Sequence, residues 1–287
     1  TVIRRAGDRP LFDKGRMIGM SFYTVHAIDA HTWHIEDFFH DYMYLVEGSE
    51  RAALIDTGMG FAGLFETVRA LTDKPVIVLN THGHLDHTGA NGQFDTAYIM
   101  RGDEALMCEH MSEDYRAVSI PAFIAETGAA VDKKTADALI RLPKDFNVSY
   151  IEDGQIIDLG ERCLKVIAVP GHTQGSAVFI DEKRGQLFSG DMLCTMGIML
   201  NFDCSLDIDT FVDSMVKLKK SAAGVTAVYG GHHVWPIQLD YCDKYIECAG
   251  RLLKDRSGSV TEHGTFGEFY RYHFEDISLT YTDAIFI

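Results

Sequence analysis

Short apolar runs separated by polar turns dominate the chain between residues 42 and 79. Residues 42–48 (YMYLVEG) and 52–56 (AALID) predict a β-hairpin, because two apolar runs flank a short polar turn. Residues 64–71 have helical spacing, and residues 76–79 (VIVL) form a continuous, β-branched run that is typical of a buried strand. This order of strand, helix and strand predicts a layered α/β architecture.

The rest of the chain continues this alternation. Further strands are predicted at residues 97–100, 151–159, 163–169, 177–181, 186–189 and 225–229, with a C-terminal hairpin at 266–274 and 277–287. Helical spacing covers residues 102–142, with a break near Pro121, and residues 207–219 and 240–254. No linker divides the chain, so we expect one domain over residues 1–287, with a helical insertion at about 102–142.

Composition narrows the class of protein. Hydrophobic residues make up 46% and charged residues 24% of the chain, as in an ordinary globular protein. The net charge of −16 leaves no surplus of basic residues for phosphates, so we expect no nucleic acid partner. No stretch approaches the roughly 20 apolar residues of a membrane span, and none of the six cysteines forms a C-x-x-C pair. We therefore expect a cytoplasmic protein with reduced thiols, no membrane partner and a small-molecule substrate.

A dense group of metal-ligand side chains follows the predicted strand at 76–79. Residues 81–87 read T-H-G-H-L-D-H and so hold three histidines and an aspartate. Imidazole nitrogen and carboxylate oxygen suit zinc, iron or manganese, and a loop at a strand end can aim several of them at one point. The alternative is a polar loop whose side chains bond one another, which four ligand-type residues at this spacing disfavour.

Three further segments place a glycine beside a ligand-type residue at a predicted strand end. They are V-P-G-H-T at 169–173, F-S-G-D-M at 188–192 and Y-G-G-H-H at 229–233. Glycine lets the backbone turn sharply where a metal or substrate approaches. Each dipeptide alone is most often a turn, but the three together with the histidine cluster predict one convergent metal site.

With L-I-D-T-G at residues 54–58, these motifs resemble the metallo-β-lactamase superfamily, in particular its glyoxalase II-like hydrolase branch. The resemblance covers roughly residues 42–232. It implies a four-layer αββα sandwich, the metallo-β-lactamase fold, with the site at one edge between two sheets. A bridging-type aspartate, Asp191, argues against a true β-lactamase.

The resemblance also implies a ligand set for two divalent metal ions, zinc with manganese or iron as alternatives. One ion would be held by His82, His84 and His172. The other would be held by Asp86, His87 and His232. Asp191 would bridge both ions, Asp86 and Asp191 would be the catalytic residues, and Asp56 would lie behind the site and fix ligand geometry.

Such a site predicts hydrolysis of an ester, thioester or lactone, because two metals lower the pKa of a bound water so that a metal-bound hydroxide can attack a carbonyl. The alternative is an oxidoreductase similar to persulfide dioxygenases, with a single iron held by two histidines and the bridging-type aspartate. A metal-binding protein without catalysis is the third reading, which the complete ligand set disfavours.

Three weaker features bear on substrate and assembly. Residues 192–216 contain no Lys or Arg and begin with a Met-rich apolar run, which predicts a largely apolar ester, thioester or lactone. Trp33, Phe38 and Phe39 would form either a substrate wall or a packed cover. The insertion at 102–142 would serve as a lid over the site or as the interface of a homodimer.

Overall fold

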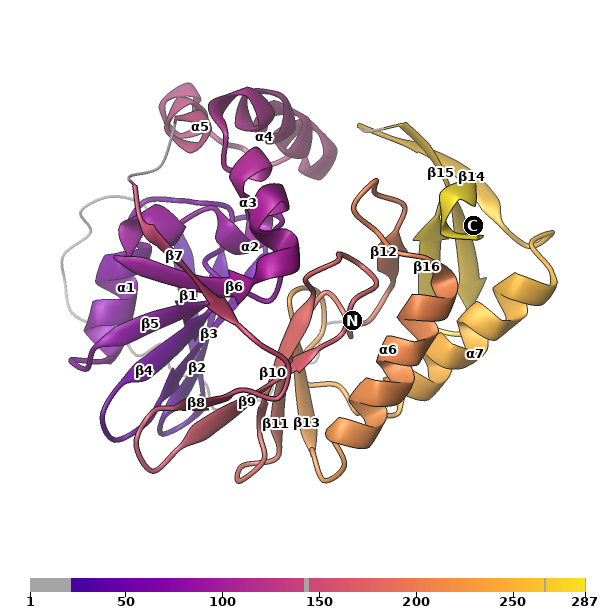
Figure 1. Ribbon diagram of the computed structural model, residues 1–287. Coiled ribbons are helices and arrows are strands. Elements are labelled where there is room, and N and C mark those ends of the chain that lie inside the picture. Colours follow the sequence, from indigo (N-terminus) through magenta and orange to yellow (C-terminus); the bar gives the residue numbers. More distant parts are fainter. Residues whose placement is uncertain (1–21, 142–144, 266, 287) are drawn as a thin grey trace, which may run out of the picture.

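The computed structural model describes residues 22–141, 145–265 and 267–286, and it contains three β-sheets with helices on their outer faces (Figure 1). The first sheet has seven strands in chain order: β1 (Tyr23–Asp29), β2 (Thr32–Asp37), β3 (Tyr42–Glu47), β4 (Ala52–Ile55), β5 (Val76–Leu79), β6 (Thr96–Met100) and β7 (Asn147–Ile151). The second sheet has the order β13 (Ala227–Gly230), β11 (Gln186–Gly190), β10 (Ala177–Asp181), β9 (Cys163–Ala168) and β8 (Ile156–Asp158).

A smaller sheet and the helices complete the described structure. The small sheet has the order β12 (Ile198–Leu200), β16 (Ile277–Tyr281), β15 (Gly267–Phe274) and β14 (Val260–Gly264). The α-helices are α1 (Leu64–Leu71), α2 (Leu85–Thr88), α3 (Glu104–His110), α4 (Glu113–Thr127), α5 (Lys133–Ile140), α6 (Ile208–Ser221) and α7 (Tyr241–Lys254). Short 3₁₀ turns are η1 (Asn91–Gln93), η2 (Arg101–Asp103) and η3 (Asp283–Phe286).

The alternation of side chains along the strands produces the layers. In β4, Ala53 and Ile55 face a core that is shared with Phe179 of β10, so this core lies between the two large sheets. The intervening Leu54 faces the opposite core, with Val68 of α1. Because both faces of these strands are buried, their sequences read as continuous apolar runs.

The outer face of the second sheet is covered by two helices that lie side by side in Figure 1, α6 and α7. Val178 of β10 shares a buried core with Phe211 of α6 and Tyr245 of α7. The same core includes Leu279 of β16, so the small sheet packs against this layer. Helices, two large sheets and helices again form the four-layer αββα sandwich that the resemblance implied.

Most predicted elements are confirmed, and two are wrong in an informative way. The strand predicted at 151–159 is instead the end of β7 and the whole of β8, in different sheets, because a turn with Gly154 at φ 79° separates them. The break predicted near Pro121 is absent, and α4 continues to Gly128, whose φ of 64° ends it. The carbonyl freed by Pro121 belongs to Ala117, which is exposed to water.

Two strands at the start of the described chain, β1 and β2, were not predicted, and neither were β12 and β14. Residues 1–21 and the predicted positions 142, 266 and 287 lie outside the described residues. No helix in the described part of the chain is long and apolar enough to cross a membrane.

Candidate metal centre

All seven predicted ligands lie at the carboxyl ends of strands, where two sheets meet. They are His82 and His84 after β5, Asp86 and His87 on α2, His172 after β9, Asp191 after β11 and His232 after β13. Strands β11 and β13 pair in parallel, so their ends reach the same edge of the sheet.

Glycine at position 231 allows this close approach. A Cβ atom there would lie 2.6 Å from Asp191 Oδ1 and 2.7 Å from His87 Cε1. Both distances are too short for any side chain, so the G-G-H segment brings the backbone of β13 against the ligands.

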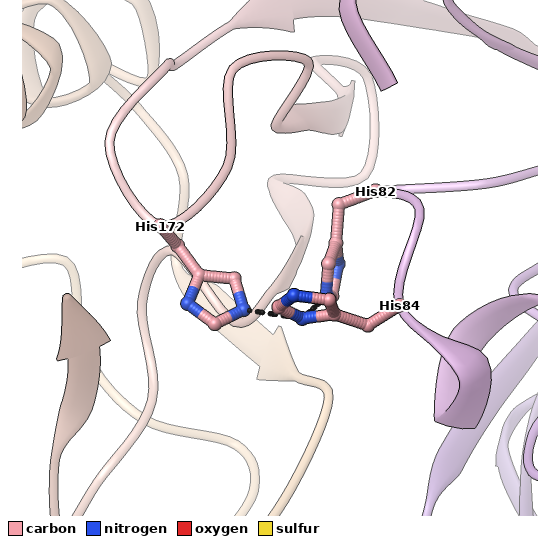
Figure 2. Close-up of side chains that lie close together, drawn as sticks. All are labelled: His82, His84 and His172. Carbon is pink, nitrogen blue, oxygen red and sulfur yellow. Dashed lines mark hydrogen bonds between the residues drawn. The ribbon is translucent and has the colours of Figure 1, made fainter. Parts of the chain in front are cut away.

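The first ligand group consists of three buried histidines that point toward one another (Figure 2). His84 Nδ1 lies 3.1 Å from His82 Nε2 and 3.0 Å from His172 Nε2. Burial, together with the neighbouring imidazoles, holds the pKa of both His82 and His84 well below the usual value. These rings are therefore neutral, which is the form that binds metal.

The second ligand group is joined to the first by Asp191. His232 Nε2 lies 3.3 Å from both Asp86 Oδ2 and His87 Nε2. Asp191 Oδ1 lies 3.3 Å from His87 Nε2, whereas its Oδ2 lies 3.5 Å from His172 Nε2. The two oxygens of one carboxylate thus face two different groups of nitrogen ligands.

Burial alone would raise the pKa of the Asp191 carboxyl, but the nearby His232 and His87 hold it well below the usual value. The pKa of Asp86 is lowered against the same penalty of burial by His87 and His232. Both carboxylates are therefore ionised, and Asp191 Oδ1 is buried without a hydrogen-bond partner among the described residues. Two buried carboxylates in one site are costly unless positive charge neutralises them, and a bound metal cation would supply such charge.

The donor set and its spacing fit divalent metal ions. Ligand atoms about 2.0–2.1 Å from a tetrahedral ion lie about 3.3 Å from one another. The distances of 3.0 to 3.5 Å among these nitrogen and oxygen atoms are close to that value. The described residues therefore offer groups that could hold metal.

Contacts behind the ligands fix their orientation. Asp56 Oδ2 accepts a hydrogen bond from His87 Nδ1 at 2.8 Å, as the resemblance implied, and Asp56 also accepts from Thr81. His172 Nδ1 donates to the carbonyl oxygen of Met199 at 2.6 Å. Each of these bonds engages Nδ1, so Nε2 is the ring nitrogen that faces the other candidate ligands.

Two more contacts behind the ligands were not predicted. His232 Nδ1 lies 3.5 Å from the buried carboxylate of Asp41, whose oxygens have no hydrogen-bond partner in the described part of the chain. His110 stacks on His84 with ring centroids 5.1 Å apart. Neither residue belongs to a ligand-type motif in the sequence, so no local signal could have found them.

A cavity of about 980 Å³ opens over the two ligand groups. Its walls come from three regions that are far apart in the chain: Phe123 of α4, Met199 of β12 with Phe202, and Phe269 of β15. Thr265 Oγ1 donates to Glu126 Oε1 at 2.6 Å and so joins the turn between β14 and β15 to α4. The helical insertion thus forms part of the cavity wall.

The cavity has an acidic polar lining. Its carboxylates are Asp41, Asp86, Glu126, Asp191, Asp203 and Glu268. The one Arg or Lys among the described lining residues is Arg271, and its guanidinium is bound to both carboxylate oxygens of Glu262 at 2.7 and 3.0 Å. No unpaired Arg or Lys side chain therefore faces the cavity from these residues.

The aromatic residues before β3 were expected to form either a substrate wall or a packed cover, and they differ in position. Phe39 lines the cavity, whereas Trp33 lies within β2 and packs against the core on the outer face of the first sheet. Phe38 is 36% exposed and packs against Phe39. Of the three, Phe39 alone lines the cavity.

A sequence model of the metallo-beta-lactamase superfamily matches residues 37–232, so the chain belongs to this superfamily. A structure of a metallo-beta-lactamase from Pontibacter korlensis has 18% identity and a TM-score of 0.58, and the match covers 79% of this chain and 99% of that one. This likeness confirms the fold.

Two curated relatives bear different enzyme names. Acyl-coenzyme A thioesterase MBLAC2 of Bos taurus is 30% identical over 163 residues, which are 53% of this chain and 57% of that protein. Hydroxyacylglutathione hydrolase of Francisella philomiragia is 28% identical over 210 residues, which are 73% of this chain and 69% of that protein. The match thus spans little more than half of the thioesterase's length.

Proposed function

We propose that this protein is a dinuclear metal-dependent hydrolase of thioesters or related esters. The observation that carries the proposal is Asp191, whose two oxygens face two groups of nitrogen ligands at the floor of a large cavity. The names of the thioesterase and the hydroxyacylglutathione hydrolase support this reaction class.

In this proposal, His82, His84 and His172 hold one ion, and Asp86, His87 and His232 hold the other. Asp191 serves both, and zinc is the expected metal because imidazole and carboxylate ligands suit it. When bound, two such ions lower the pKa of a water and polarise the carbonyl oxygen of a substrate.

The chain's own side chains then supply orientation and proton transfer. The hydrogen bonds of Asp56 and of the Met199 carbonyl hold His87 and His172 in the tautomer that presents Nε2. The Asp86 carboxylate lines the cavity, so an oxygen that does not hold the ion could take the proton of the attacking water and return it to the leaving group.

We infer that the acyl part of the substrate is apolar and that the part inside the cavity carries little negative charge. Ile198, Met199 and Phe202 offer apolar surface, and methionine adapts to varied acyl chains. Glu126, Asp203 and Glu268, the lining carboxylates away from the proposed metal ions, would repel a polyanionic group, and Arg271 is already paired.

A kinetic comparison tests both parts of this proposal. The substrates are three thioesters of the same acyl group, formed with a neutral thiol, with glutathione and with coenzyme A. Each is assayed with zinc-loaded protein and with protein whose metal has been removed by a chelator. We expect metal-dependent hydrolysis and the highest kcat/KM for the neutral thioester. A preference for the glutathione or coenzyme A thioester would refute the charge argument, and no metal-dependent hydrolysis of any thioester or ester would refute the reaction class.

The persulfide dioxygenase-like alternative is not favoured, because one relative is named as a thioesterase and the other as a hydrolase, and neither as an oxidoreductase. Oxygen uptake with a persulfide substrate and one bound iron per chain would reverse this preference.

A further inference from the structure

A second cluster of metal-ligand side chains lies outside the cavity, on the outer strands of the seven-stranded sheet. His26 of β1 and His34 of β2 are opposite one another in the antiparallel pair, and Glu36 lies two residues further along β2 on the same face. One ligand atom from each of the three residues lies within 4.8 Å of the others. None of the three lines the cavity.

His34 provides an independent observation that points to a ligand. Its side chain is 1% exposed, and neither of its ring nitrogens has a hydrogen-bond partner in the described structure. A neutral imidazole has one donor and one acceptor, and buried polar groups of this kind almost always have partners. The missing partner is therefore expected to be something that the protein binds.

The surroundings of His34 favour a metal cation as its ligand, because they keep the imidazole ring neutral. The rings of Tyr42 and Trp235 lie 4.5 and 4.4 Å from that of His34, so its environment is largely apolar. Burial, with a smaller effect of His26, lowers the pKa of His34 to about 3. The imidazole thus stays neutral, and a nitrogen lone pair is available to a metal ion.

We propose that His26, His34 and Glu36 bind a first-row divalent transition-metal ion, with zinc as the probe. Two imidazoles and one carboxylate leave a fourth tetrahedral position, which a water could occupy. Glu36 also contacts His40, and a carboxylate has enough lone pairs to bond a histidine and a metal together.

The geometry indicates an order of filling. Tetrahedral zinc holds its ligand atoms about 3.3 Å apart, and the cavity groups already approach this spacing. In the outer cluster neither nitrogen of His34 is within hydrogen-bond distance of a partner in the described structure, so its ligand atoms lie further apart and the side chains of His26 and Glu36 must rotate to close it. The outer site therefore fills at a higher free zinc concentration than the cavity groups.

Equilibrium dialysis of the full chain against buffered free zinc tests this site, with bound zinc counted per chain by elemental analysis. His26→Ala and Glu36→Gln remove ligands at positions that are not fully buried, and His34→Gln removes the buried one. His273→Ala, an exposed histidine of β15 outside the cluster, is the matched control. We expect the three cluster variants to bind one ion fewer than the wild type at saturation, and the control to bind as many.

Anomalous diffraction at the zinc edge locates the ion in zinc-saturated crystals. A peak between β1 and β2, bonded to His26 and His34, together with the loss of one ion in solution, would establish the site. An unchanged zinc count in His26→Ala and Glu36→Gln would overturn the proposal. A peak in crystals without a change of the count in solution, meaning binding at crystal concentration only, would overturn it as well.

Discussion

Replacing Asp56 with asparagine isolates the effect of one hydrogen bond on metal binding. Asp56 Oδ2 accepts from His87 Nδ1 at 2.8 Å, while its carboxylate also accepts from the backbone and hydroxyl of Thr81 at 2.7 Å each. The residue has a φ of 61°, a left-handed conformation that asparagine tolerates and alanine does not. Asp56→Asn therefore preserves the backbone and changes the hydrogen bond.

In the variant, Oδ1 of the asparagine can still accept from the Thr81 backbone, so its amide nitrogen faces His87. This nitrogen donates, so it favours the tautomer of His87 that is protonated on Nε2, the atom which faces Asp191 at 3.3 Å. That proton must leave before Nε2 can bind metal. Loss of such an outer contact typically costs about 10–100-fold in metal affinity, or about 1.4–2.7 kcal/mol.

Competition with a chromophoric chelator measures this loss for each of two zinc ions. We expect the ion held by the group that contains His87 to lose affinity by about 10–100-fold. The ion held by the three-histidine group should stay within about threefold of wild type. Asp243→Asn, an exposed carboxylate of α7 that pairs with Lys219, is the control. Unchanged affinity for both ions, with ¹⁵N NMR showing the wild-type tautomer of His87, would refute the reasoning.

Three further substitutions test the proposed roles. Asp191→Ala should lower the occupancy of both ions and abolish turnover, because Asp191 faces both ligand groups; full occupancy by elemental analysis would contradict this. Asp86→Ala should lower kcat at least about 100-fold, the lower range for a lost proton-transfer group, with the three-histidine group still filled; near-wild-type kcat at full loading would refute its role. Met199→Glu should raise KM for a long-chain thioester about tenfold, or about 1.4 kcal/mol, without changing metal content; equal loss for a short-chain ester would refute an acyl contact.

The core strands and the convergence of the candidate ligands could be predicted because their signals are local. β5 and α1 have the predicted bounds, since an apolar run and a helical period each lie within one segment. The ligand motifs follow strand ends, and parallel strands such as β11 and β13 end at one edge. Convergence of the motifs was thus a consequence of the sheet order.

The parts that could not be predicted depend on contacts between distant segments. β2 contains the polar residues His34 and Asp37, both buried, so its sequence lacks the apolar pattern of a strand. The carbonyl of Met199 orients His172, yet every residue has a carbonyl, so no sequence signature marks it. Asp41 reaches His232 across 191 positions of the chain, which only the packed sheets bring together.

The central claim is that Asp191 lies between two metal ions, and a crystal structure of the zinc-loaded protein with anomalous scattering tests it most directly. The account predicts two peaks about 3.5–4 Å apart, one on each side of the Asp191 carboxylate. A single ion at full loading, held by two histidines and Asp191, would contradict it and would point to the mononuclear oxidoreductase instead.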